Sequence, residues 1–87
     1  MSVAVEFYGV PRQRIGIAQA IADGADLGEV LVDLAHRYPR FGETCVDDER
    51  LRAGFTANLG GNRFISDPRT PLPAGEKLLI LSADAGG

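Results

Sequence analysis

The first eight residues alternate between two faces, one carrying Val3, Val5 and Phe7 and the other carrying Ala4, Glu6 and Tyr8. A period of two predicts a β-strand. Residues 9–11, Gly-Val-Pro, predict a turn that ends it. Residues 14–21 place Ile15, Ile17 and Ile21 on one side, which predicts a second strand that forms a hairpin with the first.

Residues 27–38 change to a helical period, with apolar residues at the i, i+3, i+4 and i+7 positions of one face: Leu27, Val30, Leu31, Leu34, Ala35 and Tyr38. Asp26 stands in the N-cap position, and Glu29 follows it with capping-box spacing. Pro39 predicts the end of the helix, because a residue before proline avoids the helical conformation. His36 falls off the apolar stripe and is predicted to be an exposed histidine without a ligand role.

The second half of the chain has shorter signals. Residues 41–49 predict an irregular connection that carries Cys45, whose acidic neighbours are expected to raise the pKa of its thiol. Residues 55–59 and 63–65 predict two short strands around a glycine turn. The two glycines of that turn lack the spacing and the following helix of a phosphate-binding loop.

Residues 78–81 form an unbroken apolar run, which predicts a central strand covered, or nearly covered, on both faces. The economical arrangement places the first and last strands side by side, with the helix packed across one face. The predicted fold class is therefore α+β, a β-grasp with a mixed sheet of four to five strands and one main helix. Residues 1–81 are predicted to form this domain, and residues 82–87 a flexible C-terminal tail that ends in Gly-Gly.

Composition and charge exclude several classes of function. The chain has 87 residues, which fits one domain, and a net charge of −3, which argues against nucleic-acid binding. The pairs Arg12/Arg14 and Arg50/Arg52 are expected to be solvated surface. A single cysteine and a single histidine exclude a disulfide within the chain and predict no metal site. Neither a signal peptide nor a membrane-spanning run is visible, so we expect a cytoplasmic protein.

Residues 55–87 resemble the ubiquitin-like sulfur-carrier proteins, the family of the small subunit of molybdopterin synthase and the thiamine-pathway sulfur carrier. The likeness rests on the order of short motifs: FTANLGGNRFI, Asp67, TPL at 70–72, AGEKLLIL at 74–81 and the closing Gly86-Gly87. The first half of the chain matches the family only in pattern. Much of the family has proline near Ser82 and Ala83 and a neutral residue at the position of Asp84.

The resemblance implies that the chain is a co-substrate and not an enzyme. A ubiquitin-activating-type adenylyltransferase would adenylate the carboxylate of Gly87 with ATP, and a persulfide sulfur donor would convert it to a thiocarboxylate. The positions of Gly86 and Gly87 call for glycine, because only a backbone without side chains passes through a narrow channel to an enclosed ATP site. No cofactor is expected to bind the chain itself. The residues expected to contact partners are Asp84, Ala85 and Gly86 in the tail and, in the domain, the arginines near the tail together with Tyr8, Phe55, Leu59 and Phe64. Core or hairpin packing is the alternative role of the domain residues.

Three functions remain open from the sequence. The first is a sulfur carrier, with molybdopterin (molybdenum cofactor) biosynthesis and the large subunit of molybdopterin synthase as the expected destination, and thiamine or cysteine biosynthesis as alternatives. The second is a ubiquitin-like modifier joined to target proteins through Gly87. The third is a plain interaction module in which the terminal glycines have no chemical role.

Overall fold

The computed structural model describes residues 2–83. Its elements follow one another along the chain as β1 (Ser2–Phe7), α1 (Gly9–Ile15), β2 (Gln19–Asp23), α2 (Leu27–Arg37), α3 (Pro39–Cys45), β3 (Val46–Asp47), β4 (Arg50–Leu51), β5 (Phe55–Leu59), β6 (Arg63–Ile65) and β7 (Leu78–Ser82).

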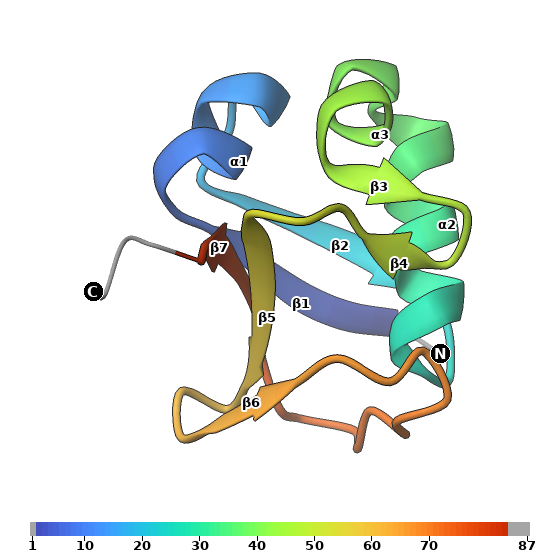
Figure 1. The fold of residues 1–87 in the computed structure, drawn as a ribbon. Coiled ribbons are helices and arrows are strands. Elements are labelled where there is room, and N and C mark those ends of the chain that lie inside the picture. Colours follow the sequence, from blue (N-terminus) through green and yellow to red (C-terminus); the bar gives the residue numbers. More distant parts are fainter. Residues whose placement is uncertain (1, 84–87) are drawn as a thin grey trace.

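The five long strands form one mixed sheet in the order β2-β1-β7-β5-β6. The last strand lies in the middle, parallel to β1 and antiparallel to β5. Helix α2 covers one face of this sheet (Figure 1). The predicted mixed sheet, the neighbouring first and last strands and the single main helix across one face are confirmed.

The core lies between the sheet and the helices α2 and α3. Alternate residues of β1 and β7 point into it, and Val5, Leu78 and Ile80 have no exposed surface. Phe7 and Phe41 meet edge to face there, with ring centroids 5.5 Å apart. Leu79 and Leu81 are only half-buried, so the near-complete cover predicted for both faces of β7 is found on one face alone: within residues 2–83, no helix lies over the other face.

Helix α2 begins as predicted. The Asp26 carboxylate accepts a hydrogen bond of 2.9 Å from the backbone N–H of Glu29, a cap that contributes about 1 kcal/mol. The Glu29 carboxylate accepts one of 2.8 Å from the N–H of Ala25, one residue before the cap. Backbone N–H groups in the first turn of α2 also donate hydrogen bonds to the carbonyl oxygens of Pro68 and Thr70. These bonds fix the proline-rich connection that leads into β7.

Two predicted elements are wrong. Residues 9–15 form helix α1 where the sequence predicted a turn followed by a strand, and the second strand begins only at Gln19. It does pair antiparallel with β1, as expected. Residues 39–45 form helix α3 where an irregular connection was predicted. Pro39 does end α2, but it also starts α3, because a proline in the first helical turn needs no N–H donor.

Leu79 and Ile80 are adjacent in β7 but differ in burial: Ile80 lies in the core, and Leu79 is half-buried on the other face. Replacing Ile80 with alanine opens a cavity in the core and is expected to cost about 2–5 kcal/mol of unfolding free energy. Leu79→Ala is the matched control, because half-buried Leu79 loses only about 1 kcal/mol of apolar burial. Urea unfolding of both variants measures the difference. Equal losses would contradict the assignment of Leu79 to the uncovered face.

Candidate functional site at the C-terminal exit

The end of β7 is held by hydrogen bonds from both sides. The backbone N–H of Val10, in α1, donates to the Ser82 hydroxyl oxygen at 3.2 Å. The N–H of Ala83 donates to the carbonyl oxygen of Gly54, in the loop before β5, at 2.7 Å. The chain therefore leaves the sheet from a fixed point between α1 and this loop.

Gly9 lies in close contact with Ser82 at the same point. Gly9 has a φ of +65°, and a Cβ at this position would lie 2.8 Å from the Ser82 hydroxyl oxygen. A side chain here would meet both the strain of the left-handed conformation and a clash with β7. Glycine thus lets the start of α1 lie directly against the last residue of the strand.

Hydrogen bonds hold the exit at Ser82 and Ala83, and a proline at position 83 could not replace them. Proline has no N–H, so it could not make the bond from residue 83 to Gly54. The Ser82 side chain is 8% exposed and supplies the contact on the other side. The exit of the chain is fixed here by polar contacts in place of a rigid ring.

Beside the exit lies the side of the sheet that no helix covers, which we call the open face. The strand register places on it Ile21 of β2, Tyr8 after β1, Leu79 and Leu81 of β7 and Phe64 of β6. Phe64 is 67%, Ile21 55% and Tyr8 44% exposed. Apolar side chains thus stay accessible to solvent next to the strand from which the C-terminal residues continue.

A polar network crosses the open face. Lys77 Nζ donates to Glu6 Oε2 at 2.8 Å, and the Tyr8 hydroxyl donates to Glu6 Oε1 at 2.7 Å. The hydrogen bond from Lys77, and then that from Tyr8, lowers the pKa of Glu6. The same two bonds raise the pKa of Lys77 and of Tyr8. The network therefore orients the Tyr8 ring through its hydroxyl, on the side of the sheet from which the chain exits.

Comparison with known proteins finds a likeness in structure alone. No family model and no curated protein matches the sequence. SAMP1, small archaeal modifier protein 1 of Haloferax volcanii, superposes with a TM-score of 0.79 at 18% identity, over 100% of both chains. A chain of the BexX/CysO complex of Amycolatopsis orientalis gives 0.78 at 24% identity, over 98% of this chain and 99% of that one.

A third neighbour comes from the complex of subunits 1 and 2 of molybdopterin-converting factor from Helicobacter pylori, with a TM-score of 0.65, 23% identity and 100% coverage of both chains. The chain has the β-grasp fold. The fold predicted from the sequence is confirmed by these superpositions together with the observed strand order.

Within this β-grasp domain, the residues predicted to dock partners lie in different places. Tyr8 and Phe64 lie on the open face. Phe55 lies on the opposite side, half-buried against the core, and lines a hollow of about 140 Å³ with Leu51 and Ile65. Leu59 is 2% exposed in the core, so it follows the alternative role, core packing, and is unavailable for docking. Asp84, Ala85, Gly86 and Gly87 lie outside the described residues.

Sequence reasoning missed two residues of the open face, Leu79 and Leu81. An unbroken apolar run hides the alternation of a strand, so both were assigned to the core. The partner strand carries the missing signal. Thr56 and Asn58 of β5 pair with Leu81 and Leu79, and these polar residues mark the less apolar side of the sheet.

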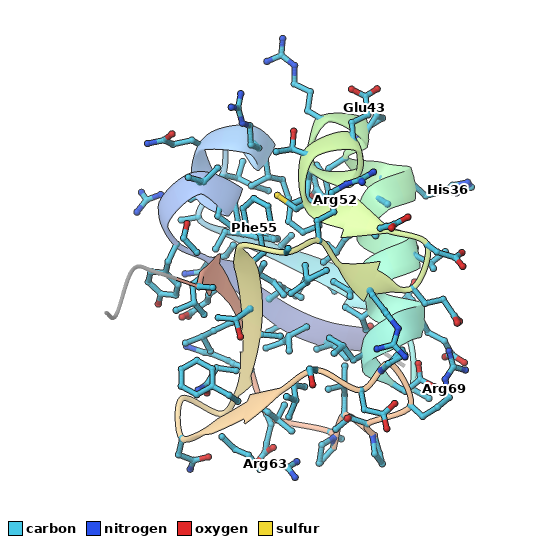
Figure 2. All side chains as sticks on the ribbon, in the orientation of Figure 1. His36, Glu43, Arg52, Phe55, Arg63 and Arg69 are labelled. Atoms are coloured by element: carbon cyan, nitrogen blue, oxygen red, sulfur yellow. The ribbon has the colours of Figure 1, made fainter. Side chains whose placement is uncertain are left out.

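The pKa of the Cys45 thiol is raised, as predicted, but for a different reason. Burial of the thiol raises its pKa, and the charges of Arg14 and Arg52 act in the opposite direction. The acidic neighbours expected to raise it are therefore not the reason. His36 is exposed and points away from α2 (Figure 2).

Within residues 2–83, no group of histidine, cysteine and acidic side chains is arranged to hold a metal ion. In the same part of the chain, no helix is long and apolar enough to cross a membrane.

The contact between Gly9 and Ser82 gives a matched test. Gly9→Ala is expected to destabilise the fold more than Gly16→Ala. Both glycines have positive φ, +65° and +83°, but only the methyl group at Gly9 meets Ser82, since nothing lies within 4 Å of a Cβ at Gly16. Thermal unfolding measures both variants, and adding Ser82→Ala should recover part of the loss at Gly9 alone. Equal destabilisation by the two glycine variants would show that no close contact exists.

The polar network predicts a pH dependence. The pKa of Glu6 is lowered in the folded state, so its contribution to stability is complete above the ordinary value of 4.5 and is lost as the pH falls through the lowered pKa. The melting temperature of Glu6→Gln should therefore fall less than that of the natural chain between about pH 7 and pH 3. Glu76→Gln is the control, because exposed Glu76 makes no salt bridge among the described residues. The network would be refuted if both variants had the pH profile of the natural chain.

Proposed function

We propose that this chain is a sulfur carrier of the ubiquitin-like type and that Gly87 is the residue that carries the sulfur. The observation that supports it best is the position of β7. The last strand lies in the middle of the sheet and is held at Ser82 and Ala83, so the four residues that follow start from a fixed point beside an accessible apolar face. The fold shared with SAMP1, with the CysO complex and with a molybdopterin-converting factor complex adds support.

The proposed chemistry takes place at the carboxylate of Gly87. A carboxylate oxygen attacks the α-phosphorus of ATP in an activating enzyme, which forms an acyl adenylate and releases pyrophosphate. The outer sulfur of a protein persulfide then attacks the carbonyl carbon and displaces AMP. A second thiol then attacks the inner sulfur of this acyl disulfide, forms a new disulfide with it and releases the glycyl thiocarboxylate. The activating enzyme and the sulfur donor supply all reacting groups other than the carboxylate.

Two surfaces would serve the partners. The residues after Ala83 enter the active site, where glycine fits because a side chain would displace the reacting carbonyl group. The open face, with Tyr8, Phe64, Leu79 and Leu81, supplies the apolar anchors in which binding energy concentrates. The activating enzyme and the synthase that accepts the sulfur are both expected to use it. Molybdopterin synthesis is the first destination to test, followed by cysteine and thiamine synthesis.

The second candidate is a protein modifier. The name of the structural neighbour SAMP1, small archaeal modifier protein 1, favours it. An adenylated Gly87 could be attacked by a lysine amine in place of a persulfide, which forms an isopeptide bond and releases AMP. Both functions would use the same C-terminal exit and an adenylated Gly87, and they differ in the nucleophile that displaces AMP.

Incubation with the activating enzyme, ATP and a sulfur donor tests the first candidate. Intact mass spectrometry should show replacement of one oxygen by one sulfur in the natural chain and no change after deletion of Gly87. The deletion should leave the melting temperature nearly unchanged, because Gly87 follows the last strand, which ends at Ser82, and has no side chain to add to the core. A chain that stays unmodified with a competent enzyme would exclude the carrier function. Conjugates in cells that disappear with Gly87 would favour the modifier.

A further inference from the structure

Ion pairs are unevenly distributed over this molecule. Arg37 forms salt bridges with Asp23 and Asp33. Arg69 pairs with Asp26 and Glu49, and Lys77 pairs with Glu6. The other arginines form none within residues 2–83, and all are exposed: Arg12, Arg14, Arg40, Arg50, Arg52 and Arg63.

Four of these unpaired arginines lie where α1, α3 and the loop after β4 meet, and we call them the basic end: Arg12, Arg14, Arg40 and Arg52. Helix α1 packs against both α3 and β7. Arg14 and Arg40 line the same surface hollow. Arg14 and Arg52 both act electrostatically on the buried Cys45 thiol, so the loop arginine belongs to the same group.

Negative charge is scarce in these segments. Across α1, α3 and residues 52–54, the only acidic side chain is Glu43, which lines the hollow with Arg14 and Arg40. Figure 2 shows Arg52 and Glu43 toward the same end of the molecule and Arg63 at the opposite end. The whole chain has a net charge of −3, so the basic end has the opposite sign to the rest of the protein.

Two arginines of the basic end, Arg12 and Arg52, lie in the segments that hold the C-terminal exit. Arg12 lies two residues after Val10, whose N–H binds Ser82. Arg52 lies two residues before Gly54, whose carbonyl binds the N–H of Ala83. The two segments that fix the exit thus each carry an unpaired positive charge, one on each side of the emerging chain.

Unpaired arginines that lie close together repel one another and add nothing to the stability of the fold. The same arrangement accelerates the approach of a negatively charged surface and orients it during encounter. It would direct that surface to the exit, with the apolar open face beside it as the short-range contact.

We propose that the basic end is an electrostatic docking surface for an acidic surface around the active-site entrance of the enzyme that activates Gly87. This inference rests on the proposed function and names the surface property of that partner. The arginines on the two sides of the exit speed association and set the orientation in which the C-terminal residues enter. They take no part in the chemistry.

The test compares two double variants with the same loss of charge. Arg12→Gln/Arg52→Gln changes the basic end, and Arg50→Gln/Arg63→Gln removes two unpaired arginines elsewhere. The association rate constant with the activating enzyme from the same organism is measured by stopped-flow fluorescence. The salt concentration runs from about 0.02 M to about 0.5 M, which shortens the screening length several-fold. Sulfur incorporation at saturating enzyme is measured in parallel.

The basic-end variant is expected to associate about tenfold more slowly at low salt, to lose most of the salt dependence and to keep full sulfur incorporation at saturation. The control variant should change the rate less than twofold. Equal effects of the two variants would reduce the role to net charge and overturn the proposal, as would a rate in the natural chain that is independent of salt.

The proposed function and the docking proposal can fail separately. If the natural chain takes up sulfur but the two double variants associate at equal rates, only the docking proposal fails. If the natural chain takes up no sulfur with a competent enzyme, the proposed function fails and the docking proposal with it. Oligonucleotide binding that the basic-end variant alone abolishes, without a change in association with the enzyme, would assign this surface to nucleic acid and overturn the proposal.

Discussion

The insertion of β7 between β1 and β5 is the contact on which the rest of the structure depends. Without it the sheet separates into a β2-β1 pair and a β5-β6 pair, each far too small to be stable alone. The most buried side chains of β7, Leu78 and Ile80, also close the core beneath α2. Because the chain's last strand is the central one, the residues after it emerge at the edge of the most firmly held part of the molecule.

The same arrangement explains why the features around the exit lie together. Pairing with β1 places β7 beside the start of α1, where Gly9 permits close approach and the N–H of Val10 reaches Ser82. Pairing with β5 places it beside Gly54. Only one side of the sheet is covered by helices, so apolar side chains remain exposed next to the exit. A fixed starting point, an apolar face and flanking arginines are the three features on which the proposed presentation of the C-terminal residues to a partner enzyme rests.

The sequence predicted the fold from its strongest periodic signals: the alternation of β1, the stripe and cap of α2 and the apolar run of β7. It failed at the two seven-residue helices. A segment this short does not show a helical period, and each helix depends on packing, through Pro11 and Ile15 in α1 and through Phe41 and Cys45 in α3. The open face was only partly foreseen. Leu59, Leu79 and Leu81 are chemically identical, and only the strand register decides which of them faces solvent.

The central claim is that Gly87 carries sulfur in the cell, and the most direct measurement is the mass of the C-terminal peptide of the protein purified from its own organism. Alkylation during lysis would trap a thiocarboxylate before it hydrolyses. We predict a peptide that ends at Gly87 with one oxygen replaced by an alkylated sulfur. A C-terminal peptide found only as the free carboxylate in cells that are making sulfur-containing cofactors, or a chain that continues beyond Gly87, would contradict it.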